Sequence, residues 1–314
     1  MKRLLAFVLA AGLVVGAVFV RRAIDDRGQV GASGVPDVVC ASEVQAACLR
    51  LASSGLIRIA RIEAPGVTTD RLSSADGTLG GDAWLVSGFW PQIVTGNRTR
   101  AGLPPLDLTS SAVLGTQPAR VFLRPPRARA TISRCSPLTW KCLAPMAAQP
   151  WTAFGGQADW GLVSLAVPPV DTTAGLVTVA TAVGSAAGTD RYASNDIVDQ
   201  VDEFLQRFSR DATTMDDPVD SMVVKPGSVD ITAGLKADAQ GQPNGSVTTV
   251  WASPVATVGA VIAGPTGGLE TGAVRDALTS TGWEHPTATS GITTGLPRPD
   301  VMDAVRNEWK QGHP

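Results

Sequence analysis

The sequence predicts an α/β protein with parallel strands, and two observations support this prediction. Between residues 37 and 94, short apolar runs alternate three times with segments of helical pattern, an order typical of a parallel sheet covered by helices. The 314 residues are 44% hydrophobic and only 17% charged, against about 25% charged in an average domain. The chain can therefore bury a sizeable core, and its length after residue 27 suits one large domain or two lobes of about 100 to 150 residues.

The first part of the chain gives the clearest pattern. Strands are expected at 37–41, 57–62 and 82–87, and helices at 43–52, 67–74 and from residue 89 onward. Gly55 is expected to close the first helix. Right-handed crossovers would place the loops that follow the three strands at one edge of the sheet.

The rest of the chain is less regular. Residues 111–123 are compatible with a strand that Gly115 and Pro118 interrupt. Strands are expected at 162–167 and 229–233, and extended chain crossing between lobes at 247–263. Helices are expected from the end of the 168–175 segment to about 183, and at 196–208, 271–282 and 299–310. A basic run at 120–134 and an acidic turn at 211–220 are both interpreted as solvated surface.

The N-terminal segment is apolar. Residues 4–20 are all apolar or glycine and lie between Lys2, Arg3 and Arg21, Arg22. As a helix this run would be about 25 Å long, slightly short of the roughly 30 Å hydrocarbon core, a gap that snorkelling arginines can close. We expect residues 1–27 to be an uncleaved single-pass membrane anchor followed by a tether at 28–34, with a cleaved signal peptide or a buried helix as alternatives.

The four cysteines form two local pairs. Cys40 and Cys48 are eight residues apart, Cys135 and Cys142 seven. Closing these two short loops costs the least chain entropy of the three possible connectivities, so disulfides are expected within each pair. Four buried free thiols, or a zinc site, are the alternatives; the spacing is wide for zinc. Disulfides would place the folded part outside the cytoplasmic membrane.

Composition excludes several classes of function. After residue 27 the chain holds 21 basic and 26 acidic side chains, a net charge of about −5, which argues against nucleic acid as a partner. The only histidines are His285 and His313, so a multi-histidine metal centre is excluded. No Gly-x-Ser-x-Gly elbow occurs, and hydrolysis is disfavoured. No cofactor is expected.

Hydroxyl-bearing residues follow several expected strands. Asp171-Thr-Thr-Ala-Gly175 leads from a strand into a helix, where free backbone N–H groups can receive a polar ligand. The alternative is an ordinary helix cap, since Asp and Thr are favoured there for stability alone. Similar junctions occur at 41–43, 65–69 and 87–90, and together the four would line the carboxyl edge of the sheet, where open α/β folds bind ligands.

These segments carry a resemblance to a known family. The stretches Asp37-Val-Val-Cys-Ala-Ser-Glu43, Asp82-Ala-Trp-Leu85, Asp171-Thr-Thr-Ala-Gly-Leu176 and Gly295-Leu-Pro-Arg-Pro299 resemble actinobacterial extracellular solute-binding proteins of the periplasmic binding protein type II class. Proteins of this kind are also found fused to von Willebrand A-type domains. The resemblance covers about residues 35 to 312.

The resemblance implies a two-lobed α/β fold with two extended crossovers and a ligand held in the cleft between the lobes. Lobe one would comprise 35–115 plus 246–314, and lobe two 116–245. Five hydroxyl side chains would face the cleft: Ser42, Thr69, Ser87, Thr172 and Thr173. Asp171 departs from the pattern of oxyanion-binding members, because its carboxylate would repel an anion unless it caps the helix. Sulfate-like and molybdate-like ligands are therefore disfavoured.

The functional hypothesis is a membrane-anchored, extracytoplasmic solute-binding-like protein without a catalytic step. It would close its lobes on a small polar ligand, with the closed state favoured only by ligand contacts to both lobes. A membrane transporter or an envelope protein would be its partner. The alternative is a non-catalytic cell-envelope interaction module that kept the fold without binding a ligand.

Overall fold

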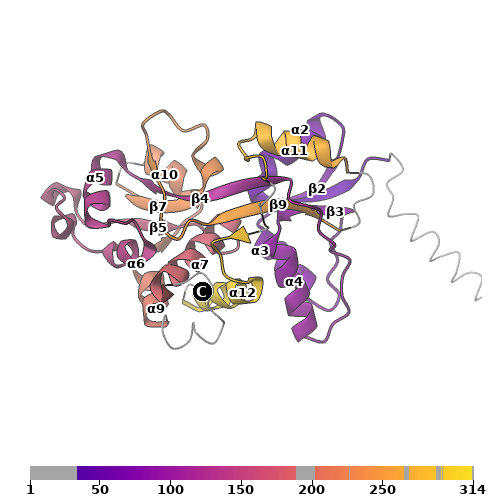
Figure 1. Ribbon diagram of the computed structural model, residues 1–314, viewed down its shortest axis with the longest axis horizontal. Coiled ribbons are helices and arrows are strands. Elements are labelled where there is room, and N and C mark those ends of the chain that lie inside the picture. Colours follow the sequence, from indigo (N-terminus) through magenta and orange to yellow (C-terminus); the bar gives the residue numbers. More distant parts are fainter. Residues whose placement is uncertain are drawn as a thin grey trace, which may run out of the picture.

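The computed structural model describes residues 34–188, 202–225, 227–264, 269–287, 291 and 293–312. Figure 1 shows an elongated molecule in which two α/β halves are joined by strands that run from one half to the other. The strands are β1 (Asp37–Ala41), β2 (Arg58–Glu63), β3 (Ala83–Ser87), β4 (Gly115–Leu123), β5 (Leu165–Val167), β6 (Thr213–Thr214), β7 (Ile231–Leu235), β8 (Thr248–Val250), β9 (Thr257–Ala263) and β10 (Thr293–Thr294).

The helices cover both halves. The α-helices are α2 (Gln45–Ser53), α3 (Pro65–Ser73), α4 (Phe89–Arg100), α5 (Pro125–Arg134), α6 (Trp140–Leu143), α7 (Thr173–Ala187), α9 (Asp202–Asp211), α10 (Pro218–Val224), α11 (Thr271–Ser280) and α12 (Pro299–Gly312). Within the described residues, five short 3-10 helices connect them: η1 (Ser42–Val44), η2 (Ala144–Met146), η3 (Trp151–Phe154), η4 (Ala158–Trp160) and η5 (Lys236–Ala239).

The sheet is mixed. Its strand order is β2-β1-β3-β9-β4-β7-β5-β6, with β10 beside β9 and β8 beside β4. The predicted parallel arrangement is confirmed for β1, β2 and β3. β9 runs antiparallel to both β3 and β4, because it returns along the molecule towards the first half.

The predicted elements of the first half are present with small shifts. β1 has the predicted bounds, and the ends of β2, β3, α2 and α3 differ from prediction by at most two residues. α3 begins at Pro65, a residue suited to the first helical position because its missing N–H would have had no partner there. The extended chain predicted over 247–263 is confirmed by β8 and β9.

Two main hydrophobic clusters form the core. The first is built on β1, β3, β9 and α4, and the second on β4, β5, β7 and α7. The division into lobes at 35–115 plus 246–314 and 116–245 stays a prediction. Helix α12 contacts both clusters: Met302 packs in the first, whereas Val301, Val305 and Trp309 pack in the second.

The two predicted disulfides are confirmed. Cys40–Cys48 joins β1 to α2, and Cys135–Cys142 joins the end of α5 to α6. The predicted membrane anchor at 1–27 and tether at 28–34 lie almost entirely outside the described residues. Among the helices that are described, none has the length and apolar character needed to cross a bilayer.

The interpretation of the basic run as solvated surface is wrong for part of it. Residues 125–134 form α5, and the run is anchored by the carboxylate of Asp230, whose side chain is 2% exposed. The Arg127 Nε atom lies 2.8 Å from Asp230 Oδ1, and Arg124 Nε lies 3.4 Å from it. Burying this carboxylate requires such partners.

Candidate functional site

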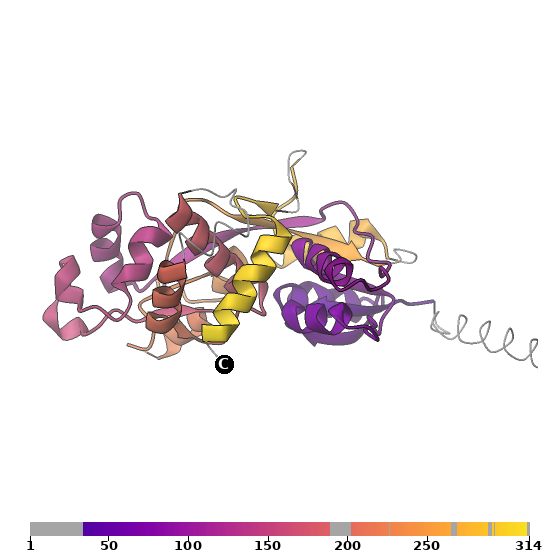
Figure 2. The same cartoon turned by 90° about the horizontal axis from the view of Figure 1, so that it is seen from below.

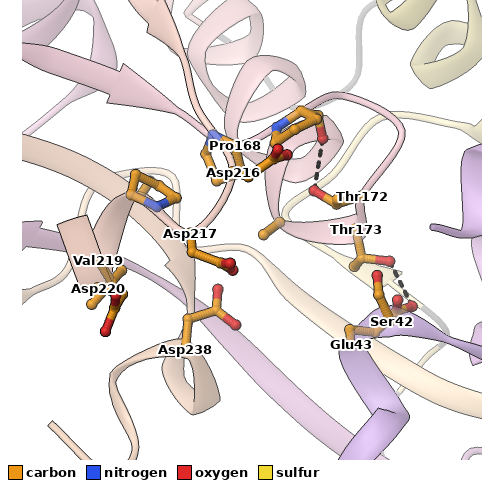
Figure 3. A pocket seen from close by; sticks show the side chains of 14 residues that line it. Ser42, Glu43, Pro168, Thr172, Thr173, Asp216, Asp217, Val219, Asp220 and Asp238 are labelled. Carbon is orange, nitrogen blue, oxygen red and sulfur yellow. Dashed lines mark hydrogen bonds between the residues drawn. The ribbon is translucent and has the colours of Figure 1, made fainter. Parts of the chain in front are cut away.

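A cavity of about 670 Å³ lies between the two halves of the molecule. Figure 3 shows that its side chains come from η1, from the connection between β5 and α7, from the start of α10, from β7 and from η5. The lining consists of Ser42, Glu43, Pro168, Pro169, Thr172, Thr173, Ala174, Asp216, Asp217, Pro218, Val219, Asp220, Ala233 and Asp238.

The first half contributes to this cavity through η1. Strand β1 is buried from Val38 to Ala41 and ends where η1 turns away. The Cys40–Cys48 disulfide ties the end of β1 to α2, so Ser42 and Glu43 are held at the carboxyl end of the strand. This is the sheet edge at which the sequence predicted a site.

The second half contributes the first turn of α7. Thr172 is the N-cap of this helix: its Oγ1 accepts a hydrogen bond from the Gly175 N–H at 3.1 Å and donates one to the Pro169 carbonyl at 2.7 Å. Of the two interpretations left open by the sequence, helix capping therefore accounts for the hydroxyl of Thr172, although the residue also lines the cavity.

Thr173 and Ser87 both bond to Glu43. The Thr173 Oγ1 atom donates to Glu43 Oε1 at 2.7 Å and accepts from the Trp90 indole N–H at 2.9 Å. The backbone N–H and hydroxyl of Ser87 donate to the same Glu43 oxygen at 3.2 and 3.0 Å. These bonds join β3, η1, α4 and α7, so they connect the two halves beside the cavity.

The remaining two predicted residues differ. Ser42 lines the cavity and is partly exposed there. Thr69 is fully buried in α3 and is not among the lining residues; its Oγ1 has no hydrogen-bond partner within the described part of the chain. The structure thus brings Ser42, Thr172 and Thr173 to the cavity, puts Ser87 behind Glu43, and leaves Thr69 outside.

Carboxylates dominate the charge of the cavity. Glu43, Asp216, Asp217, Asp220 and Asp238 all line it, and its fourteen lining residues include no lysine, arginine or histidine. In Figure 3 the carboxylates of Asp217 and Asp238 point into the same space. Asp217 adopts a left-handed backbone conformation, with φ of +45°, immediately before α10; Asp tolerates this conformation better than most residues.

The proximity of these acids affects their titration. The protein atoms surrounding the Asp238 carboxyl desolvate it and raise its pKa to about 7, although the residue remains open to the solvent of the cleft. The hydrogen bond from the Leu235 N–H opposes this rise, and the charges of Glu43 and Asp217 add to it. Burial also raises the pKa of Glu43, against the effect of its hydrogen bonds from Thr173 and Ser87. The second carboxylate oxygen of Glu43 is buried and has no hydrogen-bond partner within the described residues. Both carboxyl groups therefore hold a proton more readily than ordinary acids, and no basic side chain lines the cavity to balance their charge.

A second cavity of about 490 Å³ adjoins the first. Ser42, Glu43 and Asp238 line both. Further lining comes from Gln45, Ala46, Leu49, Ala237, Gln240, Gly241, Thr281 and Trp283. This part of the cleft offers amide and hydroxyl groups rather than additional charge, so a ligand extending into it would meet hydrogen-bonding partners.

Asp171 does not cap α7. Its carboxylate forms ion pairs with Arg306 and with Lys310, the latter at 2.7 Å. The charge that the sequence placed at the helix entry is thereby balanced within the protein. Oxyanion ligands are instead disfavoured by the carboxylates of the cavity itself.

The acidic residues of the site were not predicted from the sequence. Glu43 was visible in the junction after β1, beside Ser42. Asp216, Asp217 and Asp220 belong to the turn interpreted as solvated, and all three residues are exposed as that interpretation requires. What was not predicted is that this turn, which leads into α10, also lines the cavity. No local signal distinguishes this acidic turn from a surface turn. Among the described residues, no group of three or more metal-ligating side chains forms a metal site.

Comparison with known proteins identifies the fold. No family model and no curated protein matches the chain. Among solved structures, an ABC transporter solute-binding protein of Thermotoga lettingae bound with α-D-tagatose aligns over 89% of this chain and 93% of its own, with a TM-score of 0.55 and 10% identity. The chain has the fold of an extracellular solute-binding protein.

Two further structures have the same fold. The TpPotD lipoprotein of Treponema pallidum covers 88% of this chain and 98% of its own, with a TM-score of 0.52 and 9% identity. An extracellular solute-binding protein of Bordetella parapertussis, described as putative in its name, covers 90% and 100%, with a TM-score of 0.50 and 12% identity. The predicted α/β fold of the periplasmic binding protein kind is thereby confirmed.

Proposed function

We propose that the chain is an extracytoplasmic solute-binding-like protein that captures a small, positively charged polar ligand between its two lobes. The observation that supports the charge of the ligand is the lining of the interlobe cavity, with five carboxylates and no basic side chain. Its volume of about 670 Å³ lies within the usual range of small-molecule sites, about 300 to 1,000 Å³.

The electrostatics favour a cation. A unit positive charge about 4 Å from a carboxylate gains roughly 4 kcal/mol of Coulomb energy at an effective dielectric constant of about 20. The cost of desolvating the cation must be subtracted from this gain. Asp238, whose pKa is raised to about 7 by desolvation and by neighbouring acids, would be ionised more readily beside a cation. Sulfate, phosphate and similar anions would meet repulsion at the same place.

The five predicted hydroxyls take different places in this proposal. Ser42 contacts the ligand directly, because its side chain lines both cavities. Thr172 and Thr173 shape the wall of the cavity through the start of α7. Ser87 acts behind Glu43, and Thr69 is a packing residue of α3.

The finer parts of the proposal rest on the sequence. Residues 1–27 would anchor the protein in the cytoplasmic membrane as a single span, and the two disulfides favour an extracytoplasmic folded part. The motifs quoted above favour the actinobacterial members of the class, of the kind also fused to von Willebrand A-type domains. A membrane transporter would receive the ligand, as the names of solved proteins with this fold suggest.

A thermal-shift screen tests this function. Small amines and basic amino acids, sugars, neutral amino acids and oxyanions are added separately to the purified chain. A ligand at about 100 times its dissociation constant stabilises by about 2.7 kcal/mol, and we expect this from cations alone. Asp238→Asn should weaken the shift, whereas Asp159→Asn, an exposed residue of η4 outside the cavity, should leave it unchanged. Stabilisation by anions alone would contradict the proposal.

One observation favours the second candidate, a cell-envelope interaction module without a ligand. The hydroxyls of Ser87, Thr172 and Thr173 are bonded within the protein rather than free to meet a ligand. A flat response to every compound in the same screen would support this module.

A further inference from the structure

A buried arginine links the two halves through α12. Arg306 is 1% exposed, and its guanidinium contacts carboxylates from both halves. Nη1 and Nη2 each donate to Asp70 of α3 at 2.7 Å. Nε donates to Asp171, before α7, at 2.9 Å, and Nη2 also contacts Asp171. Nη2 further donates to the Gly66 carbonyl at 3.1 Å.

Neighbouring contacts strengthen the same link. The Lys310 Nζ atom, one turn further along α12, lies 2.7 Å from Asp171 Oδ1 and 3.3 Å from Asp70 Oδ2. The Gly66 N–H donates to the Asp171 carbonyl at 2.8 Å. A Cβ atom at Gly66 would lie 2.5 Å from Asp171 Oδ1 and 2.7 Å from its Cα, so the close approach of α3 to the loop before α7 depends on a glycine there.

Helix α12 is held mainly by the second half. Val301, Val305 and Trp309 pack in the second hydrophobic cluster, and Figure 2 shows α12 lying between that half and α4 of the first. Separating the halves would therefore carry Arg306 away from Asp70 and Gly66. Arg306 would keep Asp171 as a partner but would lose two charge-assisted hydrogen bonds to Asp70 and one hydrogen bond to the Gly66 carbonyl. Charge-assisted, bidentate bonds of this kind are among the strong ones, so water would replace them only in part.

The charges of this group are maintained at neutral pH. Burial alone would raise the pKa of Asp70, but the hydrogen bonds and charge of Arg306, together with the charge of Lys310, outweigh it and lower that pKa. Asp70 therefore stays ionised. The second bridge, from Trp90 through Thr173 to Glu43, crosses between the halves as well.

We propose that Arg306, Asp70, Asp171 and Lys310 form a latch that keeps the two lobes closed without a ligand. The closed state is then favoured by the chain's own contacts, in contrast to the sequence-based expectation that only a bound ligand favours it. A ligand meets a cleft already assembled, and it does not supply the free energy of closure. Closure by these contacts does not depend on the charge of the ligand.

The test measures the distance between the lobes directly. Spin labels are placed at Leu56→Cys, just after α2, and at Val224→Cys on α10, which are 40% and 64% exposed. Helices α2 and α10 lie in opposite halves (Figure 1). The four native cysteines are paired, so labelling is specific. Distances are recorded by double electron–electron resonance on the full chain, with native mass spectrometry establishing that no ligand is bound.

The latch requires a single narrow distribution for the unliganded wild type and a longer, broader one for Arg306→Met. The matched control is Arg71→Met, which removes an arginine paired with Glu63 inside the first half; its distribution should equal that of the wild type. If Arg306→Met does not fold, judged by near-ultraviolet circular dichroism, Asp70→Asn at a half-exposed position takes its place. A wild type that is already broad, or an unchanged distribution in the latch variant, overturns the proposal.

Discussion

Asp238 should destabilise the unliganded protein at high pH, and replacing it with asparagine should relieve this. The pKa of Asp238 is raised from 3.8 to about 7 by desolvation and by the nearby charges of Glu43 and Asp217. The folded state therefore holds a proton that the unfolded state releases between about pH 4 and pH 7. The free energy of unfolding of the wild type consequently falls as pH rises through this range.

The size of the effect follows from the shift. A little over three pKa units correspond to about 4 kcal/mol, but Asp238 is exposed to the solvent of the cleft, and screening reduces this to about 1 to 2 kcal/mol. Asp238→Asn keeps the acceptor for the Leu235 N–H and removes the charge. We expect its Tm to exceed that of the wild type by about 2 to 6 °C at pH 8.

Differential scanning calorimetry at pH 4 and pH 8 measures this. At pH 4 the Asp238 carboxyl is protonated in the folded state, so the variant and the wild type should differ little. Asp159→Asn, on the exposed surface, controls for a change of net charge and should show no gain at either pH. A lower Tm for Asp238→Asn at pH 8, or an equal gain at both pH values, would refute the reasoning.

Three further predictions concern the contacts around the site. Thr173→Val removes the hydroxyl shared by the Trp90 indole and Glu43 and should cost about 1 to 3 kcal/mol in urea unfolding; no loss would mean that these bonds are not formed. Gly66→Ala should lower the Tm, because the added Cβ would collide with the loop before α7. Gly96→Ala in α4 has open space around the added Cβ, so it should be neutral or stabilising by up to about 1 kcal/mol. Similar results for both variants would contradict the close approach of α3 to that loop. The disulfides close loops of seven and eight residues, so reducing them should lower the free energy of unfolding by about 2 to 3 kcal/mol each. Denaturant unfolding with and without reductant measures this, and an unchanged midpoint would argue against the two disulfides.

Local signals in the sequence were sufficient for much of the fold. The β-branched and apolar runs of β1, β2 and β3 predict their own strands, since alternation with helices is a local property. The disulfides were predictable for the same reason, because each closes a short loop. The mixed character of the sheet could not be predicted in this way, since the pairing of β9 with β3 joins residues far apart in the chain.

The site shows where sequence reasoning stops. Thr173 was chosen as a ligand contact, but its hydroxyl bonds to Glu43, 130 residues away. Asp171 finds Arg306 at a separation of 135 residues, and no pattern near either residue indicates the other. The acidic turn before α10 looks like a surface turn until the fold places it opposite Glu43. The negative charge of the cavity lining could therefore be recognised only from the structure.

The charge of the bound ligand is the central claim, and a matched pair of compounds tests it most directly. Isothermal titration calorimetry would compare 1,4-diaminobutane with 1,4-butanediol, which share chain length and differ in charge, on the unliganded chain at pH 8. The carboxylate-lined cavity predicts measurable binding of the diamine, binding of the diol weaker by at least about tenfold, and loss of the difference in Asp238→Asn. Equal affinity for the two compounds would contradict the account.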